Sequence, residues 1–347
     1  VAIFGNGYES GDNVKLMIVD LATGQLIKAL DTGITGTGNG LATVVPVDTN
    51  DDRITDVVFA GDLKGNLWKF DLTGNNANQW DVAYKSGSVP SPLFTAVDRN
   101  GNPQPITSRP AVAKHGTSGL MIYFGTGQYF EVGDDIIPAS PQVQTFYGIR
   151  DDGNTIARNQ LTEQFIIYEG FANLQNDTND PGDDTPTEQE VRVVTNNGFG
   201  SPVSHGWMLD LIPPAPAAAE GERVVSRAIV RSGRIIFSTS IPDPDPCGFG
   251  GTGWLMELDA ATGSRLDFSA FDLNNDVEFT EGDYVEINGQ WIPVSGLGQD
   301  EMIQTPGIVS AGDVEYKFTS GSSGKIGVTR EKGSDTSSGR QSWRQLK

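Results

Sequence analysis

The sequence predicts an all-β protein, built as a β-propeller of about seven blades. Glycine is abundant, with 43 of 347 residues. Short apolar runs repeatedly end in Gly, Asp or Asn, and no stretch keeps a helical period of about 3.6 residues for three turns. This is the pattern of strands joined by tight turns. In addition, one strand-and-turn unit recurs along the chain at a spacing close to that of a propeller blade.

The recurring unit is an apolar strand that ends in an aspartate turn. Its copies read LMIVDLATG, LWKFDLTG, FYGIRDDG, GWMLDL and WLMELDAATG, and they start at Leu16, Leu67, Phe146, Gly206 and Trp254. The turn aspartates are 51, 80, 59 and 49 residues apart, at Asp20, Asp71, Asp151, Asp210 and Asp259. Because a blade takes about 40 to 50 residues, each unit is interpreted as part of one blade. A β-sandwich or barrel, whose hairpins also end in Asp-Gly turns, is the alternative.

The chain is interpreted as a single propeller domain, residues 1–347, cut from the C-terminal part of a longer protein, because its first residues already read as a strand. Two polar, proline-interrupted segments interrupt the strand pattern. They are ANLQNDTNDPGDDTPTEQE, residues 172–190, and IPPAPAAAEGE, residues 212–222. Both are expected to be exposed loops.

Charge and composition exclude several classes of function. A net charge of -21 argues against binding to nucleic acid or to an anionic membrane surface, because either partner requires a basic face. The chain has one cysteine, Cys247, so it has no internal disulfide framework and no thiolate metal cluster. No apolar run reaches the roughly 20 residues that cross a bilayer. The acidic balance favours cations as ligands.

One acidic loop has the ligand spacing of a calcium site. In PVDTNDDRITDVVFAGD, which starts at Pro46, the residues at positions 1, 3, 5, 7 and 9 of the loop are Asp48, Asn50, Asp52, Ile54 and Asp56. This matches the front of an EF-hand loop, in which the residue at position 7 contributes its backbone carbonyl. An all-oxygen ligand set suits Ca²⁺ better than Mg²⁺, which demands stricter octahedral geometry. Apolar runs on both sides place the loop between two strands.

The loop departs from the EF-hand pattern in two places. Position 6 is Arg53 rather than glycine, and position 12 is Phe59 rather than glutamate, so Asp56 must close the loop. The alternative is a solvated Asp-rich turn, since Asp and Asn favour turns. That alternative is costly, because clustered carboxylates repel unless a cation lies among them or a pKa rises.

A second loop, FDLNNDVEFTEGDYV, is a weaker candidate. Its residues at positions 1, 3, 5, 7, 9 and 12 are Asp272, Asn274, Asp276, Glu278 (through its carbonyl), Thr280 and Asp283. Val277 occupies the glycine position, and a β-branched residue is poorly suited to positive φ. An ordinary acidic turn is the alternative here.

Signatures of catalysis are missing from the sequence. There is no phosphate-binding Walker loop and no Gly-x-Ser-x-Gly elbow, and the two histidines, His115 and His205, lie far apart beside glycines. The sequence therefore predicts a protein that is not an enzyme.

Four stretches together resemble a known family: VDTNDDRITDVVFAGDLKGNLWKFDL, MIYFGTGQYF, CGFGGTGWLMELDAATG and GRQSWRQL. They are similar to the C-terminal propeller domain of PilY-type type IV pilus biogenesis and tip-adhesin proteins. The resemblance implies a modified β-propeller with an EF-hand-like calcium loop between two strands. It also implies that calcium controls pilus extension against retraction, and hence twitching motility. The ligands it implies are Asp48, Asn50, Asp52, the Ile54 carbonyl and Asp56.

The same resemblance implies minor pilins and other pilus components as partners, adhesion to host or abiotic surfaces, and a location at the pilus tip, on the outer membrane or outside the cell. The Arg-Gly-Asp integrin motif of some members is missing here. A competing resemblance comes from VDLATGQLI, FDLTG and LDAATGSRL, which look like blade turns of quinoprotein dehydrogenases that bind pyrroloquinoline quinone and calcium. The single cysteine excludes the vicinal cysteine pair that often caps that cofactor.

Overall fold

The structure is a computed structural model that describes residues 1–34, 38–115, 119–172, 189–198, 204–245 and 249–333. Almost all regular structure in these residues is β-strand, which confirms the predicted all-β class. Helical backbone there is confined to three short 3-10 segments: η1 (Ala77–Gln79), η2 (Arg158–Gln160) and η3 (Glu281–Asp283). Tight glycine turns join the strands. At Gly65, for example, φ is +79° and a Cβ would lie 2.5 Å from the carbonyl oxygen of Ala96, so only glycine fits.

The first two sheets are formed from neighbouring segments of the chain. The first contains β1 (Ala2–Gly5), β2 (Lys15–Val19) and β3 (Leu26–Asp31) in that order. The second has the order β10-β6-β5-β4, and β7 also pairs with β6; its strands are β4 (Val45–Val47), β5 (Val57–Gly61), β6 (Asn66–Asp71), β7 (Asp81–Val82) and β10 (Phe94–Thr95). A small hairpin between β7 and β10 consists of β8 (Lys85–Ser86) and β9 (Val89–Pro90).

The third and fourth sheets combine more distant segments. The third has the order β11-β12-β13-β17-β14, made of β11 (Ala111–Lys114), β12 (Leu120–Gly125), β13 (Thr145–Asp151), β14 (Thr162–Gln164) and β17 (Gly206–Asp210). The fourth has the order β15-β16-β24-β21-β19-β18, with β20 paired to β21. Its strands are β15 (Ile166–Phe171), β16 (Glu190–Val194), β18 (Ile229–Arg231), β19 (Arg234–Ser238), β20 (Ile241–Pro242), β21 (Gly251–Asp259) and β24 (Gly296–Gln299).

Two smaller units complete the described chain. A hairpin is formed by β22 (Tyr284–Ile287) and β23 (Gln290–Pro293). The C-terminal sheet is an antiparallel meander of β25 (Gly307–Ala311), β26 (Val314–Ser320) and β27 (Ile326–Lys332).

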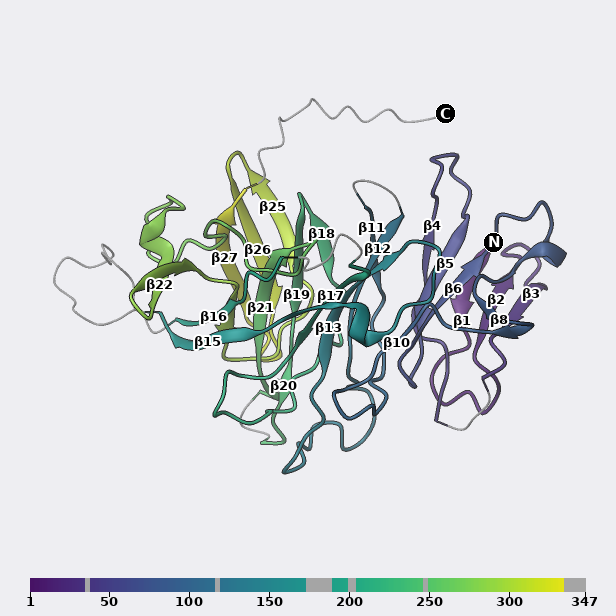
Figure 1. Ribbon diagram of the computed structural model, residues 1–347, viewed down its shortest axis with the longest axis horizontal. Helices are drawn as coiled ribbons and strands as arrows, with labels where there is room; N and C mark the ends of the chain where they lie inside the picture. Colours follow the sequence, from purple (N-terminus) through teal and green to yellow (C-terminus); the bar gives the residue numbers. More distant parts are fainter. Residues whose placement is uncertain (35–37, 116–118, 173–188, 199–203, 246–248, 334–347) are drawn as a thin grey trace.

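The first four sheets pack face to face in chain order, with an apolar core between each successive pair. These cores include Leu16 with Trp68, Phe59 with Phe124, and Phe146 with Phe237. Figure 1 shows the first sheet towards one end of the longest axis and the C-terminal sheet towards the other. Sheets that stack in this way are typical of propeller blades.

The recurring strand-and-turn units do not correspond one to one with blades. All five are strands; four of them end at the expected aspartate, and β2 ends at Val19, directly before Asp20. Two of the five, β13 and β17, nevertheless pair with each other in the third sheet. The aspartates differ as well. Asp20, Asp71 and Asp259 accept hydrogen bonds from a threonine two or three residues later, whereas Asp151 and Asp210 pair with Lys69 and Arg158.

The number of blades is not confirmed. Within the described residues, three sheets have more than three strands, and none of the sheets closes on itself. About seven blades stays a prediction.

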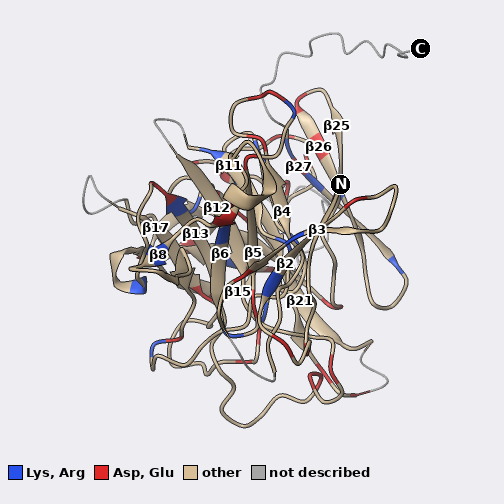
Figure 2. Ribbon diagram, turned by 90° about the vertical axis from the view of Figure 1, so that its right-hand side faces the viewer, with Lys and Arg blue, Asp and Glu red and all other residues tan. Residues whose placement is uncertain are grey.

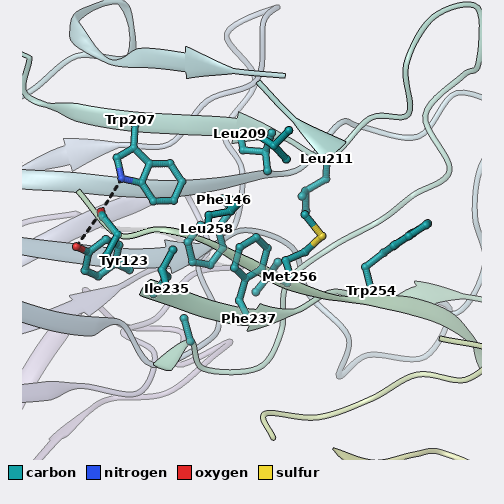
Figure 3. Packing of buried hydrophobic residues seen from close by; sticks show 14 of the residues in the cluster. Tyr123, Phe146, Trp207, Leu209, Leu211, Ile235, Phe237, Trp254, Met256 and Leu258 are labelled. Carbon is teal, nitrogen blue, oxygen red and sulfur yellow. Dashed lines mark hydrogen bonds between the residues drawn. The ribbon is translucent and has the colours of Figure 1, made fainter. Parts of the chain in front are cut away.

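The core between the third and fourth sheets is centred on Trp207. Its fully buried ring lies 5.8 Å from that of Phe146 between centroids, and its Nε1 donates a hydrogen bond of 3.0 Å to the carbonyl of Ala260 (Figure 3). The Tyr123 hydroxyl donates to the same oxygen at 3.0 Å. Gly263 approaches the ring so closely that a Cβ would lie 2.2 Å from it. This indole therefore links the two sheets by packing and by hydrogen bonding.

The fourth sheet meets the C-terminal sheet through charged side chains. Arg234 and Glu257 come from β19 and β21, Lys317 and Glu331 come from β26 and β27, and none of the four is more than 4% exposed. Lys317 Nζ lies 2.7 Å from Glu257 Oε2 and also contacts Glu331, and Arg234 Nη1 lies 2.5 Å from Glu257 Oε1. The opposite face of β26 leaves Phe318 40% exposed. The C-terminal sheet is thus polar towards the protein and partly apolar towards solvent.

The two segments that were expected to be exposed loops differ in what the structure describes. Most of residues 172–190, namely 173–188, lie outside the described residues, and Ala172 at their start is buried. In residues 212–222 the middle, 215–218, is exposed, whereas Glu222 at the end is buried and binds Arg192 at 2.6 Å. The last residues of the segment 212–222 therefore belong to the interior of the protein.

Candidate metal centre

The Asp48 loop, residues 48–56, connects β4 to β5 in the second sheet. The two strands are antiparallel, with Val47 opposite Val57, so the loop lies between two strands as the sequence predicts. Val57 and Phe59 of β5 are buried, whereas residues 49–54 are exposed. An acidic loop at the surface is thus joined directly to a core strand.

The side-chain oxygens of the Asp48 loop accept hydrogen bonds from the loop's own backbone. Asp48 Oδ2 accepts from the Arg53 N–H at 2.6 Å. Asn50 Oδ1 accepts from the Asp52 N–H at 2.9 Å, and Asp52 Oδ1 accepts from the Ile54 N–H at 2.8 Å. Alternate side chains are therefore folded back onto the same stretch of chain, which winds the loop tightly.

Asp56, the last residue of the loop, is hydrogen-bonded to its beginning. It is 7% exposed, and its Oδ2 accepts from the N–H of Thr49 at 2.8 Å and from the Thr49 hydroxyl at 2.5 Å. The last acidic residue is thereby tied to the second residue of the loop. The sequence analysis overlooked Thr49, although it stands directly beside Asp48.

The loop stabilises negative charge at its first residue. Partial desolvation would raise the pKa of Asp48, but the backbone N–H groups of residues 50–53 outweigh this effect and lower that pKa. Arg53 adopts a φ of +71° and Asp51 a φ of +65°. Position 6 therefore has the left-handed turn that glycine usually makes, although the residue is arginine.

The Asp272 loop, residues 272–283, follows Phe271, which forms an isolated bridge to Glu331 of β27. It repeats the hydrogen bonds of the Asp48 loop at positions 1, 3 and 5: Asp272 Oδ2 accepts from Val277 N–H at 3.2 Å, Asn274 Oδ1 from Asp276 N–H at 3.1 Å, and Asp276 Oδ1 from Glu278 N–H at 2.7 Å. The left-handed residues also recur at positions 4 and 6, where φ is +57° at Asn275 and +71° at Val277. The positive φ that appeared unsuitable for valine is therefore adopted.

The closing residue of the Asp272 loop is Asp283. Its Oδ1 accepts from the Leu273 N–H at 2.8 Å, so the last acidic residue again binds the second residue of the loop. Burial raises the pKa of Asp283 to about 6, although backbone N–H groups act in the opposite direction. Thr280 caps η3, because its hydroxyl oxygen accepts from Gly282 N–H at 3.1 Å, and it is therefore occupied in a structural role. The Glu278 side chain is exposed.

In both loops the carboxylates face backbone N–H groups. Accordingly, the described part of the chain contains no group of three His, Cys, Asp or Glu side chains that is placed to hold a metal ion. The oxygen donors present nevertheless suit a hard cation such as Ca²⁺, which also accepts amide and carbonyl oxygens. In the Asp48 loop they are Asp48, Asn50, Asp52, the Ile54 carbonyl and Asp56.

Basic residues from distant parts of the sequence contact both loops. Lys114 Nζ of β11 lies 2.9 Å from Asp51 Oδ2, and Arg330 Nη1 of β27 lies 2.6 Å from Asp272 Oδ2. Their sequence positions gave no signal for these contacts, because pairing of distant charges depends on the tertiary fold. Many other acidic residues visible in Figure 2 lie in connecting loops. The acidic charge is therefore available at the surface to attract cations.

Comparison with known proteins shows which proteins this chain resembles. A family model described as "PilY1 beta-propeller domain" matches residues 1–180. A type IV pilus biogenesis factor PilY1 homolog of Xylella fastidiosa is 38% identical over 277 residues, which is 76% of this chain and 18% of that protein. The type IV pilus biogenesis factor PilY1 of Pseudomonas aeruginosa strain PAO1 is 33% identical over 99% of this chain and 31% of that protein.

A solved structure agrees with these relatives. The crystal structure of the Pseudomonas aeruginosa PilY1 C-terminal domain has a TM-score of 0.77 and 29% identity, over 95% of this chain and 69% of that chain. The fold is thus that of a propeller domain from a type IV pilus biogenesis factor. The chain belongs to the PilY1 family. It spans less than a third of the two relatives' own lengths, and in its described residues no helix is long and apolar enough to cross a membrane.

Proposed function

We propose that the chain is a calcium-binding domain of a type IV pilus protein, and that the Asp48 loop is the calcium site. The observation that supports this most is the combination of the ligand spacing with a tightly wound backbone. Asp48, Asn50 and Asp52 are each folded onto the loop, and Asp56 holds the two ends of the loop together. The loop is therefore held in one conformation by its own hydrogen bonds, which lowers the cost of ordering it when a cation binds.

Calcium offsets the repulsion between the carboxylates that the fold brings together. The missing glutamate at position 12 leaves fewer negative ligands, so we expect a dissociation constant of about 10⁻⁶ M or weaker. Such a site is partly filled or empty when calcium is scarce. Its occupancy can therefore report the calcium concentration outside the cell.

In the cell, calcium occupancy of this loop controls pilus extension against retraction, and therefore twitching motility. Membership of the PilY1 family supports this role, as does the position of the loop, which is exposed but continuous with the buried strand β5. A conformational change of the loop on calcium binding would therefore act directly on β5 of the second sheet. The proposed partners are minor pilins and other pilus components. The proposed location is the pilus tip or the cell surface, where the whole protein supports adhesion.

The test compares two exposed neighbours: Asp52 belongs to the proposed ligand set, whereas Asp51 lies outside it and pairs with Lys114. Asp52→Ala removes a proposed ligand, and Asp56→Ala removes the closing carboxylate, whereas the matched control Asp51→Ala removes the same charge from a residue outside the ligand set. We expect each of the first two to lose the equivalent of calcium that binds at the Asp48 loop, as measured by calorimetry with metal-stripped protein. At a calcium concentration a hundredfold above Kd, they should also lose about 2.7 kcal/mol of ligand-linked stabilisation. The Asp51→Ala protein should retain both.

The same variants in the full-length gene test the cellular role. With normal protein abundance, Asp52→Ala and Asp56→Ala should change the number of surface pili and the diameter of twitching zones, and Asp51→Ala should not. If piliation and motility are unchanged although calcium binding at the Asp48 loop is shown to be lost, calcium there has only a structural role. Equal calcium binding by the ligand variants and the control would refute the site itself.

We also propose that the domain is not an enzyme. Both relatives are described as pilus biogenesis factors, and no observation in the structure favours the quinoprotein alternative. Purified protein with added pyrroloquinoline quinone, calcium, an alcohol and a redox dye should reduce the dye no faster than buffer. Quinone-dependent dye reduction that scales with protein concentration would contradict this.

A further inference from the structure

The Asp272 loop contains a buried carboxylate oxygen without a partner. The Asp272 side chain has 0% exposure, and its Oδ1 is a buried atom that accepts no hydrogen bond. The other oxygen, Oδ2, accepts hydrogen bonds from the Val277 N–H and from Arg330. A buried acceptor without a donor is destabilising. Within a loop of oxygen donors, a cation is the ligand that would satisfy it.

The neighbouring donors fit the same ligand. Asn274 is 3% exposed and Asp283 is fully buried, which makes this loop much more enclosed than the Asp48 loop. Val277 is held at a φ of +71°, a strained conformation for a β-branched residue that persists only where the surroundings impose it. The Asp48 loop and the Asp272 loop differ in sequence, yet both have left-handed residues at positions 4 and 6.

We propose that the Asp272 loop is a second divalent-cation site, selective for Ca²⁺, that fastens the C-terminal sheet to the rest of the protein. The ligands are Asp272 through Oδ1, Asn274, Asp276 and the Glu278 carbonyl, and Asp283 holds the loop closed. This site rests on residues separate from those of the proposed function, and either site can fail without the other.

The connection to the C-terminal sheet is direct. The Asp272 N–H donates to the Arg330 carbonyl of β27 at 3.2 Å, and the Lys332 N–H donates to the Ala270 carbonyl at 2.8 Å. Arg330 also binds the carboxylate that would hold the ion. A cation at Asp272 Oδ1 therefore fixes the point where β27 meets the loop. Binding should lower the rate of local opening of β27.

The experiment uses Ca²⁺ alone as the probe, with the Asp48 loop disabled by Asp52→Ala and Asp56→Ala. This double variant should still bind one equivalent of calcium in calorimetry. Adding Asp276→Ala should weaken that binding by about tenfold or more, a change of about 1.4 kcal/mol. The matched control Glu278→Ala removes an exposed carboxylate but keeps the carbonyl ligand, and should change the affinity less than about threefold.

Hydrogen exchange supplies a second readout. In the same background, calcium should slow amide exchange in Ile326–Lys332, and Asp276→Ala should remove this protection. If the double variant folds poorly, the stoichiometry of the otherwise unchanged protein should fall from two equivalents to one on Asp276→Ala alone. The proposal is overturned if the double variant binds no calcium at millimolar concentration, or if Asp276→Ala leaves affinity, stoichiometry and exchange unchanged.

Discussion

Replacing Lys317 with methionine is expected to lower the free energy of unfolding by about 3 to 5 kcal/mol, because it removes the cation that two buried carboxylates, Glu257 and Glu331, share. Lys317 and Glu257 are both inaccessible to solvent, and Nζ lies 2.7 Å from Glu257 Oε2. Burial lowers the pKa of Lys317, although Glu257 opposes this shift. Methionine has a similar shape but no charge, so the change isolates the electrostatic contribution. Urea unfolding followed by tryptophan fluorescence measures it.

A compensating variant provides the control for Lys317. Adding Glu331→Gln to Lys317→Met removes one of the carboxylates that lost its partner, so part of the stability should return. Non-additivity of this kind is expected for residues in one charged network. A loss below about 1 kcal/mol for Lys317→Met alone would indicate that the carboxylates find other partners or take up protons at little cost.

Trp207→Ala is expected to destabilise the protein by about 3 to 5 kcal/mol through the cavity left between the third and fourth sheets. The indole is fully buried, stacks on Phe146 and donates to the Ala260 carbonyl (Figure 3). Alanine removes both the packing and the hydrogen bond. Chemical unfolding followed by far-UV circular dichroism measures the change without relying on the deleted fluorophore.

Trp207→Phe separates the two contributions. It keeps most of the apolar volume and loses the N–H donor, so its cost should be clearly smaller than that of alanine. The Ala260 carbonyl still accepts from Tyr123 in this variant. If phenylalanine proves as damaging as alanine, the hydrogen bond and the shape of the indole matter more than the buried volume.

Sequence periodicity predicted the class of fold, the strands and the place of the Asp48 loop, because these depend on local signals. Alternating apolar residues define strands, and Asp and Asn define their turns. The grouping of strands into sheets was not predictable in the same way. The units that end at Asp151 and Asp210 look like separate repeats, yet they pair as β13 and β17, since pairing depends on contacts between distant segments.

The C-terminal sheet shows a second limit of sequence patterns. In β26, alternation alone would place Tyr316 and Phe318 inside and Glu315 and Lys317 outside. The structure has the reverse, because Arg234 and Glu257 of the fourth sheet provide partners for the charged face. Similarly, both acidic loops were visible in the sequence, whereas Lys114 and Arg330, which contact them, were not. Those contacts exist only once the sheets are assembled.

The place of β24 in the fourth sheet has a consequence for the order in which the chain folds. This strand, Gly296–Gln299, lies between β16 and β21, so β16 has no partner on that side until most of the chain has been synthesised. The first two sheets, by contrast, join strands that are close in sequence and close their loops early. During synthesis or export, we therefore expect the N-terminal sheets to form while β16 and β21 still expose unpaired edges. Such edges are sites of aggregation, so truncation before Gly296 should move more of the protein into the insoluble fraction than is found for the full chain.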